Sequence, residues 1–293
     1  MAKMGSKVEC IWDAQASLGE GPLWSQSRNG IFWVDIIGRR LHFLSLSDGE
    51  QKTWRMQEKI GWVVETGDGN LICGLKSGIT LFNPVNNESE IMINLEPDFP
   101  DNRLNDAKVD KYGRIWAGTM DDREISHTGS LYRIDPDRTW EKVDSGYVVS
   151  NGPAFSPEGD ILYHTSTMSR QIFAFDLDIN GEIKNKRIFI TFSDSEGYPD
   201  GMACDSEGGL WVAHWGGWRI SRFLKDGTLD RVVKMPVEKP TSICFGGAEL
   251  DQAFITSASV QLEKSNKSEQ PLAGGVFSID LGVTGLQSYS FIG

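Results

Sequence analysis

Several features that would indicate other classes of protein are scarce or missing in this sequence of 293 residues. No stretch of about 18 consecutive apolar residues occurs, so the sequence offers no candidate transmembrane helix. Positive charge is in deficit, because 29 Lys and Arg face 41 Asp and Glu and leave a formal net charge of −12. An acidic surface repels phosphate groups, so we expect neither nucleic acid nor a membrane as a partner.

Cysteines are few and show no C-x-x-C spacing; Cys10, Cys73, Cys204 and Cys244 lie in apolar runs, which favours buried thiols. The first ten residues, MAKMGSKVEC, contain no apolar segment of the kind found in signal peptides. We therefore expect a cytoplasmic protein with reduced cysteines.

Motifs of several enzyme classes are also missing. The four histidines form no H-x-H or HExxH pattern, and no G-x-S-x-G segment occurs, which argues against a serine hydrolase. The glycine-rich segments GDGNL and WGGW lack the context of a phosphate-binding loop, so nucleotide binding is not supported.

What the sequence does contain is a repeat of short apolar, aromatic-rich runs, each following a turn, at spacings of about 40 to 50 residues. A second run with alternating character follows each of them about ten residues later, as in GSLYRIDP at 129–136. The first runs are GIFWVD (30–35), GNLICGL (69–75), GRIWAGT (113–119), GDILYHT (159–165), GGLWVAH (208–214) and DQAFITS (251–257).

Six repeats of this length, each with room for four short strands, are typical of a β-propeller. A β-sandwich or two small β domains is the alternative, but no linker or change in composition divides the chain. We predict an all-β protein that forms a single six-bladed β-propeller domain over residues 1–293. The run KVECIW (7–12) is expected to close the ring by pairing with the last blade near residues 286–291.

Three turns place an oxygen-bearing side chain beside Gly and Pro at matching positions of three repeats: GEGPLW with Glu20, SNGPAFSP with Asn151 and YPDGMACD with Asp200. The innermost strands of a propeller converge on its channel, so we expect these side chains to meet there. Two carboxylates and an amide oxygen suit one divalent cation, Ca²⁺, Mg²⁺ or Mn²⁺, and are acceptable to Zn²⁺ or Fe²⁺. Three protein ligands leave positions open for water and substrate. Taken singly, each motif is more often a simple turn.

The segment NRLNDAKVD at 102–110 places Arg103 and Asn105 on one side of an extended chain, where they could hold the oxygens of a polar substrate. A surface Arg and a turn Asn are the alternative. His164 and His214 lie at matching places in two of the repeated runs, so a pair facing the channel is an alternative to ordinary packing. Trp215 follows one of these runs and would either line a pocket or pack between blades.

These segments, in this order and spacing, resemble the SMP-30/gluconolactonase/LRE family, and within it most of all the bacterial aldonolactonases. The resemblance covers residues 18–281 and includes GRIWAGTM, SPEG, PTSICFGG and PLAGGVFSID. It implies a six-bladed propeller with one divalent metal on Glu20, Asn151 and Asp200, and a sugar lactone contacted by Arg103 and Asn105.

The family often places a substrate-binding acid shortly after AGTM, where this chain reads MDDRE. The matching position falls on Arg123, between Asp122 and Glu124, and we expect Asp122 to contact the substrate, with Arg123 as the alternative. Ser166 stands where an acid is frequent in the family, so that part of the rim is expected to differ.

The resemblance implies a carboxylic ester hydrolase that opens an aldonolactone, such as L-arabinono-, D-xylono- or D-gluconolactone, to the aldonic acid. Asp200 is the candidate general base, with a metal-activated water as the alternative. There are two rival functions. One is a propeller esterase or phosphotriesterase with the same metal site, and the other is a non-catalytic Ca²⁺-binding protein. We expect a monomer or a weak homo-oligomer.

Overall fold

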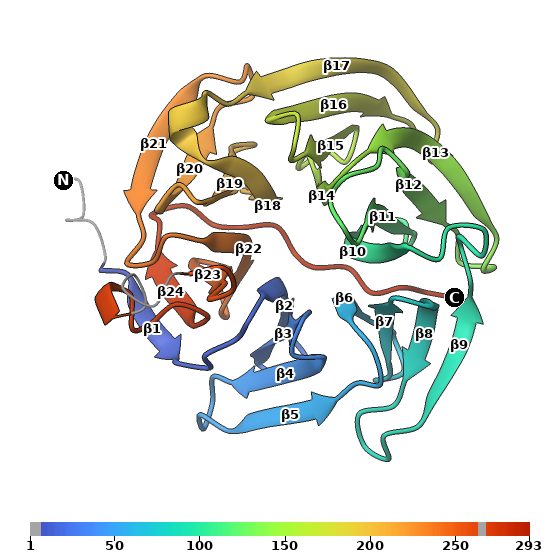
Figure 1. Cartoon of the computed structure of the whole chain (residues 1–293), viewed down its shortest axis with the longest axis horizontal. Coiled ribbons are helices and arrows are strands. Elements are labelled where there is room, and N and C mark those ends of the chain that lie inside the picture. The colour runs from blue at the N-terminus through green and yellow to red at the C-terminus, as the bar shows by residue number, and fades with distance from the viewer. Residues whose placement is uncertain (1–6, 263–267) are drawn as a thin grey trace.

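The protein is described by a computed structural model that covers residues 7–262 and 268–293. Six four-stranded antiparallel sheets stand around a common axis like the blades of a propeller (Figure 1). The predicted all-β fold with six blades is therefore confirmed.

Each of the first three blades is a meander whose strands run outward from the axis in chain order. Blade 1 contains β2 (Gly19–Ser25), β3 (Gly30–Asp35), β4 (Arg40–Ser45) and β5 (Gln51–Arg55). Blade 2 contains β6 (Ile60–Glu65), β7 (Leu71–Leu75), β8 (Gly78–Phe82) and β9 (Ser89–Ile93). Blade 3 contains β10 (Asn102–Val109), β11 (Ile115–Asp121), β12 (Gly129–Ile134) and β13 (Trp140–Tyr147).

Blades 4 and 5 repeat this meander, and blade 6 differs in the origin of its outermost strand. Blade 4 contains β14 (Ser150–Phe155), β15 (Ile161–Ser166), β16 (Gln171–Leu177) and β17 (Ile183–Thr191). The 3₁₀ helix η1 (Asp194–Glu196) leads to blade 5, with β18 (Tyr198–Cys204), β19 (Leu210–Trp215), β20 (Arg219–Phe223) and β21 (Leu229–Lys234). Blade 6 contains β22 (Pro240–Gly246), β23 (Gln252–Ser257), β24 (Val276–Asp280) and β1 (Glu9–Trp12).

Blade 6 is completed by the first strand of the chain. β1 pairs with β24, where Cys10 lies opposite Phe277. The prediction that the N-terminal run pairs with the last blade is confirmed, but the expected partner at residues 286–291 is wrong. The pairing instead continues the meander β22–β23–β24 outward, because β24 still has a free edge for one more strand.

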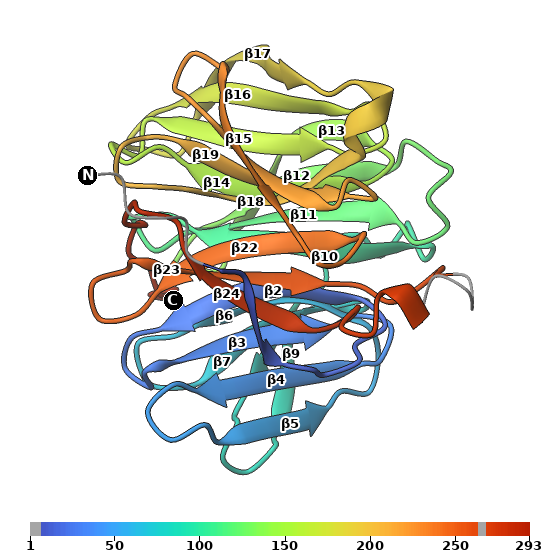
Figure 2. The ribbon, with the colours of Figure 1, turned by 90° about the vertical axis from the view of Figure 1, so that its left-hand side faces the viewer.

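Residues 286–291 form a tail that crosses the axis of the ring on one face (Figures 1 and 2). It enters at blade 5, where Gly285 bridges Asp205, and ends at blade 2, where Phe291 bridges Thr66 in parallel. The Phe291 amide donates to the Glu65 carbonyl at 2.8 Å. This tail therefore ties together blades on two sides of the ring.

The apolar core is divided among the gaps between blades. Six hydrophobic clusters each join two neighbouring blades, so burial within the described residues holds every blade to the next. Trp33, Trp62, Trp116 and Trp211 are among the largest fully buried side chains. The outermost strands of blades 1 to 5, in contrast, are mostly exposed.

An aspartate before the second strand anchors the tryptophan of two blades. In blade 5, Asp205 accepts hydrogen bonds from the indole of Trp211 at 2.9 Å and from Arg222 Nε at 2.7 Å. In blade 3, Asp110 bonds in the same way to Trp116 and Arg114. The acidic turns of the repeat thus bind a buried indole and a buried guanidinium, which satisfies polar groups inside the core.

All four cysteines are free thiols, with Cys73, Cys204 and Cys244 buried and Cys10 half-buried. Within residues 7–262 and 268–293, no helix is long and apolar enough to cross a bilayer.

Candidate metal and substrate site

Glu20, Asn151 and Asp200 lie near the start of three innermost strands, β2, β14 and β18. The sequence placed them in turns, whereas the structure places them in strands, each at an irregularity of the ladder. A bulge re-aims side chains at the end of a strand, which is where all three residues lie.

Glycine makes two of these bulges possible. Gly21 and Gly152, which directly follow Glu20 and Asn151, adopt φ values of +53° and +76°. Residues with a Cβ rarely adopt this left-handed conformation, so glycine is favoured at both positions. The glycines that follow Glu20 and Asn151 are therefore part of the geometry that presents these two candidate ligands.

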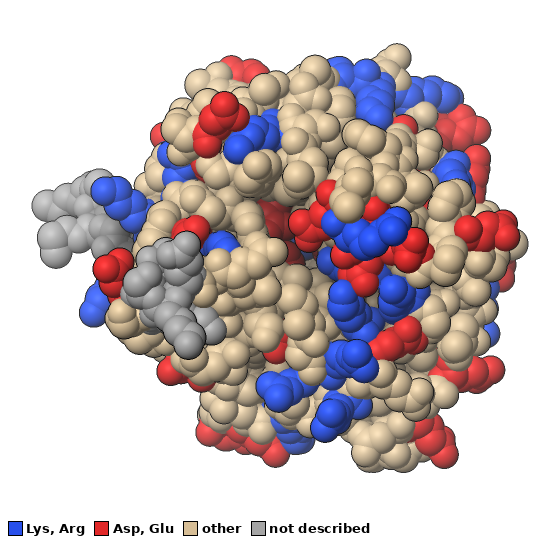
Figure 3. All heavy atoms as spheres, in the orientation of Figure 1, with Lys and Arg blue, Asp and Glu red and all other residues tan. Residues whose placement is uncertain are grey.

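The three side chains lie at the bottom of a cavity of about 290 Å³ that also contains Arg103 and Asn105 in its lining. Glu20, Asn151 and Asp200 are 5%, 3% and 5% exposed. Figure 3 shows acidic side chains at the bottom of the hollow in the centre of this face. We call this side of the ring the site face.

The carboxyl groups of Glu20 and Asp200 lie close enough to share a hydrogen bond. Burial raises the pKa of Glu20, and repulsion from Asp106 raises it further. The pKa of Asp200 is likewise raised by burial, and then by Glu20 and Asp106. Acids brought together out of water in this way are stabilised by a cation, so the chemistry of the donor set fits a divalent metal.

Asp106 is a third buried acid, which the sequence analysis did not single out. Its carboxylate accepts hydrogen bonds from the backbone amides of Gly152 at 2.9 Å and Ala107 at 2.8 Å. Across the described part of the chain, no group of three or more His, Cys, Asp and Glu side chains has an arrangement suited to a metal. The candidate ligand set is therefore two carboxylates with the Asn151 amide, and Asp106 adds negative charge behind them.

A directed chain of hydrogen bonds runs through the amide of Asn151. Arg103 Nη1 donates to Asn105 Oδ1 at 2.6 Å, and Asn105 Nδ2 donates to Asn151 Oδ1 at 2.9 Å. Asn151 Nδ2 donates to Thr167 Oγ1 at 3.0 Å, and this hydroxyl donates to the Pro199 carbonyl at 3.0 Å. Since guanidinium groups only donate and carbonyls only accept, both amides have one allowed orientation, and Asn151 Oδ1 keeps a lone pair for a metal.

Asp122, which the sequence analysis assigned to the substrate, lies beside Arg103 and is not part of the cavity lining described above. Its carboxylate accepts from Arg103 Nε at 2.9 Å and from Lys59 Nζ at 2.7 Å, and it pairs with Lys76 at 3.4 Å. This arrangement makes Asp122 a support for the Arg103 guanidinium. Arg123 points to Asp101 and Asp121 and is 60% exposed.

Glu124 is the acid after AGTM that lines the cavity. The Asp121 carboxylate accepts hydrogen bonds from the amides of Arg123, Ile125 and Ser126, which folds the segment into a tight loop. Glu124 lies within this loop with a φ of +59°. No periodic pattern could have indicated its direction, because the strand ends at Asp121.

The two histidines do not face this cavity. His164 and His214 are fully buried, and their strands β15 and β19 are the second strands of their blades, one step away from the axis. His214 contacts the ring of Phe192, and His164 contacts the ring of Tyr147. Trp215, in contrast, does line the cavity.

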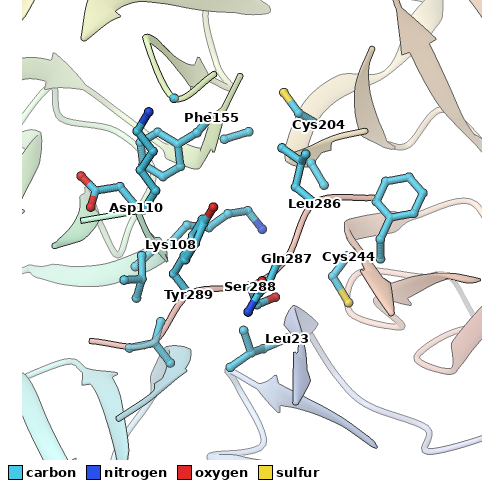
Figure 4. A pocket seen from close by; sticks show the side chains of 18 of the residues that line it. Leu23, Lys108, Asp110, Phe155, Cys204, Cys244, Leu286, Gln287, Ser288 and Tyr289 are labelled. Atoms are coloured by element: carbon cyan, nitrogen blue, oxygen red, sulfur yellow. The ribbon is translucent and has the colours of Figure 1, made fainter. Parts of the chain in front are cut away.

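A second cavity of about 150 Å³ lies at the other end of the axis, under the C-terminal tail. Figure 4 shows Lys108 pointing into it, opposite Leu286 and Gln287 of the tail. Its lining includes Cys204 and Cys244 but none of the three candidate ligands. We call this side of the ring the tail face.

Comparison with known proteins identifies relatives along almost the whole chain. A family model described as SMP-30/gluconolactonase/LRE-like region matches residues 18–259. The chain is 32% identical to a 6-deoxy-6-sulfogluconolactonase of Pseudomonas putida, over 99% of this chain and 100% of that protein. It is 34% identical to regucalcin of Gallus gallus, over 98% and 99% of the two chains.

Among solved structures, a calcium-binding regucalcin from Agrobacterium tumefaciens superimposes with a TM-score of 0.93 at 25% identity, over 98% of this chain and 97% of that one. The similarity thus extends along the whole ring in both sequence and structure. The chain belongs to the SMP-30/gluconolactonase/LRE-like family.

Proposed function

We propose that this protein is a metal-dependent hydrolase of sugar lactones, which opens an aldonolactone to the aldonic acid. The observation that carries the proposal is the pair of buried acids, Glu20 and Asp200, beside the fixed amide oxygen of Asn151 at the bottom of the site cavity. Relatives named as lactonases and the family itself support the class of substrate.

Glu20, Asn151 and Asp200 are the residues that would hold one divalent cation, which can be Ca²⁺, Zn²⁺, Mn²⁺, Mg²⁺ or Fe²⁺. When bound there, such a cation supplies Lewis acidity toward the carbonyl oxygen of the lactone. The open side of the cavity above these ligands leaves room for substrate.

Substrate hydroxyls are bound by the wall that blade 3 contributes. Arg103 donates hydrogen bonds, and its guanidinium is held in place by Asp122 at 2.9 Å. Glu124 accepts hydrogen bonds from hydroxyl groups, and it takes the role first assigned to Asp122. Asn105 contributes to the same wall, although its amide is largely occupied by Arg103 and Asn151.

Asp200 serves as the general base. Water adds to the carbonyl carbon of the lactone while one of its protons passes to the Asp200 carboxylate. The bond between the carbonyl carbon and the ring oxygen then breaks, and the ring oxygen leaves as a hydroxyl after taking up a proton. Burial raises the pKa of Asp200 in the metal-free protein, whereas a cation held by this carboxylate would lower it and keep Asp200 ionised and able to accept this proton.

A panel of lactones tests this function. Purified protein is treated with a chelator, reloaded with single metals, and assayed with L-arabinono-, D-xylono-, D-glucono- and D-galactonolactone. We expect metal-dependent hydrolysis well above the spontaneous rate, and its loss in Glu20→Gln and Asp200→Asn. Glu158→Gln, an exposed acid that pairs with Lys225, is the matched control and should retain full activity.

Aryl esters and organophosphates in the same assay separate the lactonase from a propeller esterase or phosphotriesterase. Faster turnover of either than of every lactone would favour the esterase. Cation binding without turnover of any substrate would favour a non-catalytic Ca²⁺-binding protein.

A further inference from the structure

The mouth of the site cavity is largely apolar, although the exposed Gln261 also lines it. Ile37 is 42% exposed and Met168 is 45% exposed, and both belong to loops on the site face. Half-buried apolar side chains complete this part of the lining. We define the apolar mouth as Leu18, Ile37, Met168, Tyr198, Trp215 and Val260.

Polarity in the cavity changes with depth. The candidate ligands at the bottom are at most 5% exposed, whereas the apolar side chains nearest to solvent are more than 40% exposed. An exposed loop usually carries polar side chains, and single apolar residues on a surface need no explanation. Six apolar or aromatic side chains around one opening, two of them exposed and four half-buried, lie above a polar floor and indicate a ligand with a polar end and an apolar end.

Polarity also differs between the two sides of the cavity. Arg103, Asn105 and Glu124 all come from blade 3, whereas the apolar mouth comes from blades 1, 4, 5 and 6 and the segments beside them. Figure 3 shows charged side chains crowded on one side of the central hollow. Hydroxyl groups therefore find charged partners toward blade 3, whereas above the floor the other blades offer Gln261 and Thr167, whose hydroxyl is already bonded to Asn151 and Pro199.

A sugar lactone with its carbonyl at the floor must place its distal carbon toward the opening. A hydroxyl on that carbon would give up water at the apolar mouth and gain little in return, whereas a methyl group would gain apolar contact. Apolar pockets typically distinguish two substrates that differ by one such group by about ten- to a hundred-fold in kcat/KM.

We propose that the preferred substrates are terminal-deoxy aldonolactones, in which the carbon farthest from the carbonyl carries no hydroxyl. This inference rests on the proposed lactonase function and adds a preference for the chemical group at the end of the substrate that faces solvent. Ile37 and Met168 are the residues that determine this specificity.

Matched pairs of lactones test the preference. L-fucono-1,4-lactone and L-galactono-1,4-lactone differ by one terminal hydroxyl, as do L-rhamnono-1,4-lactone and L-mannono-1,4-lactone. We expect kcat/KM to favour the deoxy member by at least about ten-fold in one or both pairs. Isothermal titration of the metal-loaded protein with L-fuconate and L-galactonate gives the same comparison without turnover, and L-fuconate should bind more tightly.

Substitutions at the mouth then locate the preference. Ile37→Gln and Met168→Gln should each reduce the deoxy preference to less than about three-fold while the hydroxylated lactone is still hydrolysed. Ile188→Gln, on the outermost strand β17 and 55% exposed, adds the same polar group elsewhere and should leave the preference unchanged. A preference that survives both mouth substitutions would overturn the role of the apolar mouth.

Equal or better hydrolysis of the hydroxylated lactones in both pairs would overturn this inference and leave the lactonase function intact. Failure of all four lactones with every metal, together with failure of the four lactones used above, would instead overturn the lactonase function itself.

Discussion

The guanidinium of Arg103 sets the orientation of the Asn151 amide through one intervening side chain, Asn105. Arg103 Nη1 donates at 2.6 Å to Asn105 Oδ1, which forces Asn105 Nδ2 toward Asn151 Oδ1 at 2.9 Å. Asn151 must then donate from its nitrogen to Thr167 at 3.0 Å. Arg103, which lines the cavity, thus determines the orientation of the Asn151 amide, a candidate metal ligand.

Thr167 is the last side chain in this series of hydrogen bonds, so its hydroxyl should affect metal binding without touching the metal. We expect Thr167→Val to weaken binding of the divalent cation by about ten- to a hundred-fold, the usual effect of losing a group that orients a ligand. Thr167→Ser keeps the hydroxyl and should bind nearly as tightly as the wild type. Titration of metal-free protein measures both, and equal affinities for the Val and Ser variants would contradict the prediction.

The buried Glu20 carboxyl group of the metal-free site predicts that the free energy of unfolding depends on pH. The pKa of Glu20 is raised from 4.5 to about 8, mainly by burial and then by Asp106. The folded state therefore holds this proton more tightly than the unfolded chain does, and the resulting stabilisation is complete below about pH 4.5 and lost as the pH rises toward 8.

Glu20→Gln removes this effect, so the Tm of the wild type relative to the variant should fall between about pH 4.5 and 8. Thermal melts in chelator measure the difference, with Glu158→Gln as a control that should track the wild type. A constant difference across this range would show that Glu20 does not titrate as a buried acid. At neutral pH, saturating metal should raise the Tm of the wild type by more than that of the variant, because only the wild type keeps the full ligand set.

The Asp205 carboxylate should be important for the stability of blade 5. Its side chain is fully buried and binds Arg222, whose side chain is 5% exposed, and the indole of Trp211. Asp205→Ala leaves a buried guanidinium with only its outer partners, and we expect a loss of about 3–5 kcal/mol of unfolding free energy. Asp226→Ala, in an exposed turn of the same blade, should cost at most about 1 kcal/mol in urea denaturation.

Anchoring of the C-terminal tail can be tested separately from the active site. Phe291 is 1% exposed and packs in the cluster between blades 2 and 3, so Phe291→Ala should cost about 3–5 kcal/mol. The neighbouring Ile292 is 68% exposed, and Ile292→Ala should have little effect on the denaturation midpoint. Both variants should keep the wild-type KM at a temperature where they are folded, because the tail lies on the tail face.

Sequence periodicity revealed the ring but not its innermost strands. Runs such as GIFWVD are buried on both faces and form the second strand of each blade. The innermost strands carry glycine, proline and polar residues and are interrupted by bulges, as at Glu20 and Asn151, so their pattern resembles turns. The same glycines made the candidate ligands visible in the sequence.

The parts of the site that the sequence did not indicate depend on contacts between blades or on the shape of a loop. Asp106 is held by the Gly152 amide from blade 4, and Thr167 reaches both Asn151 and the Pro199 carbonyl of blade 5. Glu124 lies in a loop whose shape is set by Asp121. Contacts between blades depend on how the blades lie beside one another, and a loop follows no strand periodicity. A repeat in the sequence therefore specifies neither.

The pairing of β1 with β24 has a consequence for how the chain is synthesised. The strand Glu9–Trp12 is translated before every other strand of the ring, yet its partner Val276–Asp280 is the last strand in the order of the chain. The ring therefore cannot close until all six blades have been translated, and a chain that stops before Val276 retains one strand without a partner. Premature termination should consequently yield open, aggregation-prone fragments and not smaller working propellers.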